Sequence, residues 1–200
     1  MSALEVVFSV PENVVQLPFD DDAAVAVAAR ASLERFPTPV SDKDIAFHEG
    51  VFLRVAQNMR NTAVDECFIV LPEPPGLGFM AYLSVRYHPN SDEASVADLV
   101  AESAGGTRIV LGEPDVTTQE TPLGVGTRNL LRFSTEAPVK KRFGRKTEAP
   151  VYEQLSWYWA VKTADGEPFV VNVSAFTFDL GVTPLTRPII DAFARAIEFA

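Results

Sequence analysis

The chain contains few side chains capable of nucleophilic or acid–base chemistry: two histidines, His48 and His88, and one cysteine, Cys67. His48-Glu49 has no second histidine four residues later, so the helical metalloprotease pattern is absent. No Gly-x-Ser-x-Gly motif, which would expose a serine nucleophile on a sharp turn, occurs in the sequence. Cys67 begins an apolar run, which is typical of a small buried side chain. We therefore expect the histidines to lie at the surface or at the edge of the core, and we predict no catalytic residues and no enzyme activity.

Two further motifs resemble phosphate or metal sites but have simpler interpretations. Gly124 and Gly126 precede a strand pattern, and neither a helix with a third glycine nor a Gly-Lys-Ser/Thr sequence follows them. They are expected to form a turn before that strand. Three aspartates at residues 20–22 stand directly before an alanine-rich helical segment, where carboxylates cap free backbone N–H groups. We predict no metal site and no cofactor.

One segment of this acidic chain is strongly basic. Five of the 17 basic residues fall within residues 140–146, although the formal net charge of the chain is -10. They are Lys140, Lys141, Arg142, Arg145 and Lys146. The segment is either a solvated loop or a docking loop for an acidic protein partner. The acidic remainder of the chain opposes nucleic-acid binding, so we predict a protein partner and no nucleic acid.

A polar and aromatic surface is predicted on one face of the strands. Side chains alternate between the two faces of a strand, and each of several strands has one less apolar face. The proposed surface consists of Tyr82, Arg86, Arg128, Tyr152 and Tyr158, with His88, Arg132, Gln154, Asn172 and Ser174 beside them. Tyrosine and arginine are favoured at contact surfaces, so this face suits a ligand or a partner. The alternative is that another helix covers it.

The pattern of elements predicts an α+β fold with a mainly antiparallel sheet. Residues 20–36 and 41–60 have helical spacing and form a helical hairpin, and a third helix begins near residue 90. After residue 65 the apolar period changes to two, and turns such as Asp165-Gly166 join consecutive strands. Alternation along residues 152–162 buries Trp157 and Trp159 on the same face. A last helix is expected to begin at Thr186, with Pro188 in its first turn.

Length and composition are those of one soluble domain, here residues 1–200. Residues 1–64 contribute the N-terminal strand and helical hairpin, and residues 65–200 contribute the strands with two helices. No apolar run approaches the roughly 20 residues of a membrane span. A single cysteine cannot form an internal disulfide, and the first residues lack the pattern of a signal peptide. A cytoplasmic location is therefore expected.

The order of hairpin, helix, strands and terminal helix over about residues 66–200 resembles the PsbP-like fold. Gly124-x-Gly126-x-Arg128 leading into a strand, the strands 152–162 and 169–178, and the helix 187–199 carry the resemblance. Photosystem PsbP proteins, the Ran-binding Mog proteins and the LpqN-type actinobacterial lipoproteins share this fold, and the alanine- and valine-rich composition also resembles actinobacterial proteins. The resemblance implies an α/β sandwich, with the N-terminal helical hairpin as an addition.

The resemblance also implies a binding or accessory function without catalysis, because most members of the group bind or assemble other molecules. The partner and the oligomeric state stay open. Two alternatives remain: a small-molecule-binding protein or weak hydrolase that uses the polar sheet face, and a cytoplasmic immunity-type protein.

Overall fold

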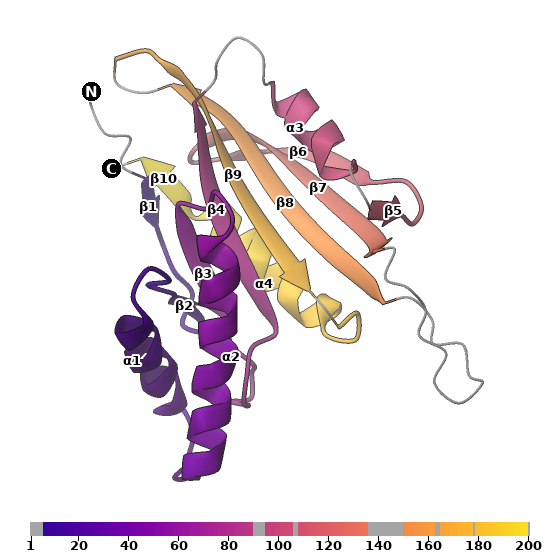
Figure 1. The fold of residues 1–200 in the computed structure, drawn as a ribbon. Coiled ribbons are helices and arrows are strands. Elements are labelled where there is room, and N and C mark those ends of the chain that lie inside the picture. Colours follow the sequence, from indigo (N-terminus) through magenta and orange to yellow (C-terminus); the bar gives the residue numbers. More distant parts are fainter. Residues whose placement is uncertain are drawn as a thin grey trace, which may run out of the picture.

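The computed structural model describes residues 6–89, 95–105, 108–135, 150–162, 165–177 and 179–199. The elements in these ranges follow each other as shown in Figure 1. They are β1 (Val6–Phe8), β2 (Val14–Gln16), α1 (Asp22–Leu33), α2 (Asp42–Arg60), β3 (Glu66–Val70), β4 (Ala81–Pro89), α3 (Val96–Ser103), β5 (Arg108–Val110), β6 (Asp115–Thr121), β7 (Gly124–Thr135), β8 (Val151–Lys162), β9 (Pro168–Thr177), α4 (Thr183–Arg195) and β10 (Ile197–Phe199). None of the helices in these ranges is both long enough and apolar enough to cross a membrane.

The main sheet is antiparallel throughout, as the sequence predicted. Its strand order is β2-β3-β4-β9-β8-β7-β5, and β6 also pairs with β7. Hairpins form β3–β4, β6–β7 and β8–β9, whereas β4 and β9 are neighbours despite the long segment between them. The predicted α+β class is therefore confirmed.

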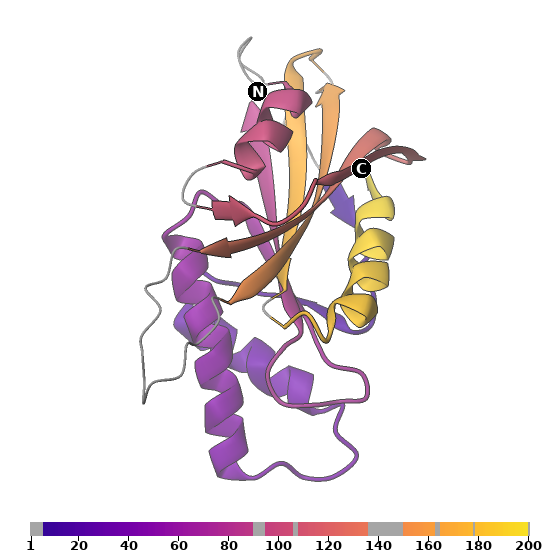
Figure 2. The same cartoon turned by 90° about the vertical axis from the view of Figure 1, so that its right-hand side faces the viewer.

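Helices cover both faces of this sheet. Figure 2 shows α4 on one side and α2 and α3 on the other, with the strands between them. We call the first side the α4 face and the second the α3 face. These two helical layers matter for function because each polar side chain of the sheet lies either against a helix or against solvent.

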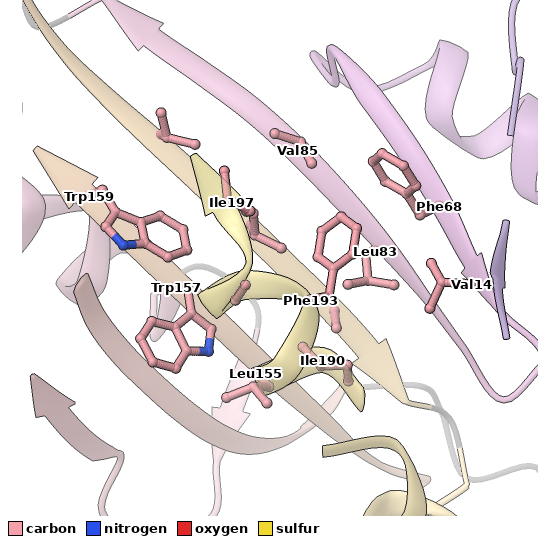
Figure 3. Close-up of a cluster of buried hydrophobic side chains, with 14 of the residues drawn as sticks. Val14, Phe68, Leu83, Val85, Leu155, Trp157, Trp159, Ile190, Phe193 and Ile197 are labelled. Atoms are coloured by element: carbon pink, nitrogen blue, oxygen red, sulfur yellow. The ribbon is translucent and has the colours of Figure 1, made fainter. Parts of the chain in front are cut away.

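The α4 face holds the larger core, which is built around two tryptophans (Figure 3). Trp157 and Trp159 are fully buried on the same face, as predicted, and their rings stack at 5.7 Å with an interplanar angle of 13°. Trp157 Nε1 donates to Asp191 Oδ1 of α4 at 2.9 Å, and Trp159 Nε1 donates to Thr121 Oγ1 at 2.9 Å. Both indole N–H groups are thus satisfied, which removes the cost of burying them.

Gly126 lets this stack form. It is paired with Trp159 in the register of β7 and β8, and a Cβ on it would lie 2.6 Å from Trp159 Nε1. Gly124 follows a two-residue turn at the end of β6 and has a φ of +116°, a backbone angle that residues other than glycine rarely adopt. The two glycines therefore serve turn and packing, in agreement with the structural interpretation of this motif.

A second core joins the helical hairpin to the α3 face of β3. Cys67, Ile69 and Leu71 point toward α1 and α2, while Phe68 and Val70 belong to the tryptophan core. Side chains cap both helices of the hairpin: Asp21 accepts from the N–H of Ala23, as expected from the three aspartates, and Ser41 accepts from the N–H of Asp44. Burial raises the pKa of the Cys67 thiol to about 12, so it is an un-ionised core side chain.

The ends of two helices differ from the sequence prediction. Helix α3 begins at Val96 behind a Ser95–Asp98 capping box, and residues 90–94, where its start was predicted, lie outside the described residues. Helix α4 begins at Thr183 instead of Thr186, because Pro184 occupies its first turn. It also ends at Arg195 rather than continuing to residue 199, since residues 197–199 form β10 and pair with β1.

Candidate functional site

Polar side chains from three neighbouring strands gather on the α3 face. In β4, β9 and β8 the register pairs Ser84 with Ser174 and Arg86 with Asn172, and it pairs Asn172 in turn with Tyr158. Directly paired residues share a face, and neighbouring strands are about 4.8 Å apart. The alternation of the sequence thus becomes a polar patch that runs across the sheet.

A pocket of about 460 Å³ lies over this patch. Its floor comes from β4, β8 and β9, and its wall comes from α3, Gly105 and β5. The lining residues are Ser84, Arg86, His88, Leu99, Glu102, Ser103, Gly105, Arg108, Gln154, Tyr158, Asn172, Ser174 and Phe176. This volume is within the usual range for small-molecule sites, about 300–1,000 Å³.

The floor of the pocket is a connected hydrogen-bond network. The hydroxyls of Ser156 and Ser174 lie 2.9 Å apart, and Ser174 Oγ donates to Asn172 Oδ1 at 3.2 Å. Asn172 Nδ2 donates to the Trp157 carbonyl at 3.1 Å, and Gln154 Nε2 donates to Ser156 Oγ at 2.9 Å. These buried polar groups hold one another in place, so the floor is formed before any ligand arrives.

Helix α3 is attached to the sheet mainly by polar contacts. No side chain of α3 is fully buried. Asn129 Nδ2 donates to Ser103 Oγ at 2.9 Å, and Arg108 Nη1 donates to the Ser103 carbonyl at 2.9 Å. The helix therefore covers part of the α3 face without filling the space over the strands.

Two guanidinium groups line the pocket in different ways. Arg108 is fixed: its Nη1 also donates to Gln154 Oε1 at 2.7 Å, and its plane lies over the rings of Phe133 and Phe176 at 4.7 and 5.8 Å. Arg86 Nε is buried, and within the described part of the chain it has no hydrogen-bond partner.

Two other titratable groups at the pocket, His88 and Tyr158, are held neutral. Burial lowers the pKa of His88 below 6.5, and the charge of Arg86 lowers it further. Burial raises the pKa of Tyr158 above 10 despite its hydrogen bonds with Ser156 and Ser103. By formal charge, the pocket lining contains two cations, Arg86 and Arg108, and one carboxylate, Glu102.

Four of the five residues predicted for the polar-aromatic surface lie on this face. Arg86 and Tyr158 line the pocket, although Tyr158 is buried and not a surface residue. Tyr82 stacks on Phe176 at 5.5 Å, outside the lining. Tyr152 packs against Phe133 with ring centroids 5.6 Å apart.

Placing Arg128 on this surface was wrong. Its strand partner is Trp157, so Arg128 faces α4, where its Nε donates to Asp191 Oδ1 at 3.0 Å. Arg132 lies on the same side and donates to Glu153 at 3.1 Å. The prediction assumed that the less apolar faces of the strands lie on one side of the sheet. Instead, Asp191 of α4 and Glu153 of β8 form ion pairs with these two cations on the α4 face.

The residues that form the wall of the pocket were not predicted from the sequence. Glu102, Ser103 and Arg108 come from α3 and β5, which are short elements with weak patterns. Nothing in the residues next to Arg108 showed that it would lie beside Gln154, 46 residues away. The basic residues Lys140, Lys141, Arg142, Arg145 and Lys146 lie outside the described residues, so their docking role stays a prediction.

A serine–histidine pair also occurs in the structure, within the helical hairpin. Ser32 Oγ and His48 Nε2 are 2.7 Å apart, and the Gly78 N–H donates to His48 Nδ1 at 3.0 Å. Because Nδ1 accepts, the proton of the neutral ring is on Nε2, which donates toward serine and cannot remove its proton. His48 is only 1% exposed, so the expectation of a surface or core-edge position was wrong: it links α1, α2 and the loop after β3.

The described residues contain no group of three or more histidine, cysteine, aspartate or glutamate side chains that could hold a metal ion.

Comparison with known proteins shows a distant structural likeness. A scan against protein-family models finds no matching family, and a search of curated proteins finds no matching protein. Among solved structures, the chain is similar to LpqN, involved in cell envelope biogenesis of Mycobacterium tuberculosis, with 13% identity and a TM-score of 0.42. That alignment covers 99% of this chain and 84% of LpqN. A likeness at this level carries no argument about function.

Proposed function

We propose that this protein is a non-enzymatic binding protein that takes up a small polar molecule in the pocket between α3 and the sheet. The observation that supports this is the pocket itself: about 460 Å³, with hydrogen-bonding side chains converging from three adjacent strands. Such a site fixes the orientation of a ligand through a few well-placed polar groups. The proposal develops the polar-face hypothesis and keeps the accessory role inferred from the PsbP-like order of elements.

The arrangement favours binding over catalysis. The floor hydroxyls of Ser156 and Ser174 are hydrogen-bonded to each other and to amide groups, and within the described ranges no histidine, aspartate or glutamate side chain hydrogen-bonds to either of them. Ser84 Oγ donates to the carbonyl of Ser174 at 3.3 Å. Activation of a serine requires a base within hydrogen-bond reach of its hydroxyl, so these serines are better suited to holding a ligand.

The test is a ligand screen by ¹H–¹⁵N NMR with four classes of small polar molecule: sugars, amino acids, dicarboxylates and phosphate monoesters. At least one class should shift the amide signals of residues 84–88, 99–105 and 172–176 together. Leu99→Trp, which places an indole in the pocket, should abolish that response. Ala97→Trp, on the exposed side of the same helix, is the matched control and should preserve it.

Two results would overturn the proposal. One is that no member of any class shifts these amides at millimolar concentration. The other is that the shifts are the same in wild type and in Leu99→Trp, which would place binding elsewhere.

A further inference from the structure

We infer that the ligand of this pocket carries an oxyanion, either a carboxylate or a phosphate group, and that the guanidinium of Arg86 binds it. The inference rests on the proposed function and specifies its ligand class. It is based on the Arg86 Nε atom, which has no acceptor within the described ranges, on the residues around Arg86 and on the charge of the lining.

Arg86 is the only lining residue with a buried side-chain nitrogen that lacks an acceptor within the described ranges. In contrast, the guanidinium groups of Arg108, Arg128 and Arg187 each donate to a protein acceptor. A buried cationic N–H without an acceptor is costly, so native proteins rarely leave one unless a ligand, an ion or water completes it. The Nε atom of Arg86 therefore marks the position where an acceptor is missing.

The neighbours of Arg86 do not supply that acceptor. Its strand partner Asn172 uses its carbonyl oxygen to accept from Ser174 and its amide to donate to the Trp157 carbonyl. The pKa of His88 is lowered, and a cationic form of that ring would add a second repelling charge beside Arg86. Both polar groups of the Asn172 side chain are thus already hydrogen-bonded, and neither pairs with Arg86 Nε.

The shape and charge of the site favour an anion. The Nε–H and one Nη–H of a guanidinium form a parallel pair that matches two oxygens of a carboxylate or phosphate. Arg108, held over Phe133 and Phe176, adds a second fixed positive charge, and Glu102 is the single carboxylate of the lining. The net charge of the described lining is therefore positive in a chain whose formal charge is -10.

The test uses two charged probes with their neutral counterparts: succinate with succinamide, and glycerol phosphate with glycerol. Binding is measured by NMR titration, with the ¹Hε–¹⁵Nε signal of Arg86 as a direct readout, assigned by its loss in Arg86→Gln. We expect at least one charged probe to shift this signal and to bind tenfold or more tightly than its neutral counterpart. The charged probe that binds more tightly shows whether the ligand carries a carboxylate or a phosphate group.

Substitutions of Arg86 distinguish the effect of its charge on binding from any effect on folding. Arg86→Gln should weaken the charged probe at least tenfold, and Arg86→Lys, which keeps the charge without the paired donors, should give an intermediate affinity. Arg54→Gln, an exposed arginine of α2, is the control and should bind as the wild type does. Amide spectra of each variant establish that it is folded.

Failure of the inference differs from failure of the proposed function. If neutral molecules bind in the pocket as tightly as charged ones and Arg86→Gln has no effect, the anion inference is wrong and the binding function stands. If the charged probes leave the Arg86 Nε signal unmoved and the whole panel leaves the pocket amides unmoved, both are wrong.

Discussion

Replacing Gly126 by alanine should destabilise the protein, because the new methyl group would meet both buried tryptophans. Its Cβ would lie 2.6 Å from Trp159 Nε1 and 3.0 Å from Trp157 Cε3. The Trp159 ring would have to move by about 0.8 Å to reach ordinary van der Waals distance. That movement would stretch its hydrogen bond to Thr121, 2.9 Å long, and disturb a close-packed stack of fully buried rings.

The size of the effect follows from two opposing contributions. Overpacking a core costs about 1–3 kcal/mol. Alanine in place of glycine within a strand recovers about 0.5–1 kcal/mol through lower chain entropy. We therefore expect a net loss of up to about 2.5 kcal/mol in the free energy of unfolding, with a central value of about 1 kcal/mol.

Gly50 offers a matched control of opposite sign. It lies inside α2, and a Cβ there would meet nothing within 4 Å. Gly50→Ala should therefore stabilise the protein by about 1 kcal/mol, the difference in helix propensity. Urea denaturation followed by tryptophan fluorescence measures both variants, because the two tryptophans lie in the core that Gly126 contacts. A Gly126→Ala protein at least as stable as wild type, or a Gly50→Ala protein less stable than it, would refute the packing argument.

Three further predictions concern the same structure. Trp157→Ala should lower the free energy of unfolding by about 3–5 kcal/mol, and an unchanged urea midpoint would contradict the observed burial. Asp191→Asn keeps an acceptor for the Trp157 indole but removes the charge facing Arg128, so urea denaturation should show a loss of about 1–3 kcal/mol; wild-type stability would mean that the pair contributes nothing. Burial lowers the pKa of His48, so the unfolded chain binds more protons than the folded one. The free energy of unfolding should therefore be retained above pH about 6.5 and fall as the pH drops below it, in pH-dependent urea titrations. His88 acts with the same sign, so His48→Gln should flatten this dependence in part, and an equal slope in both proteins would exclude His48 as a source.

Local patterns in the sequence were enough for most of the elements. The caps at Asp21 and Ser41 depend on residues within one helical turn, and the structure has both. The alternation around Trp157 and Trp159 places both rings on one face because side-chain direction in a strand has a period of two. The turn at Gly124 and the burial of Cys67 are equally local consequences of residue type.

The candidate site was predictable in part. Arg86 and Tyr158 were assigned to a shared polar face from the alternation along their strands, and the register pairs both with Asn172 on the α3 face. The alternation of side chains along β7 gave the wrong face for Arg128. Alternation shows which residues share a face, but it does not show which of two half-apolar faces meets the core. That choice depends on Asp191, 63 residues later in the chain.

The sequence by itself determined where helices and strands form and which residues alternate along them, since these depend on neighbours a few positions away. Only the tertiary structure decided that α3 packs against β8 and that β5 pairs with β7 at the edge of the sheet, so that Arg108 and Glu102 join Arg86 around one pocket. It also decided that residues 197–199 leave the helix to pair with β1 at the other end of the chain. The physical reason is common to these cases: pairing and packing energies come from residues distant in sequence, and they outweigh the small local preferences of short segments.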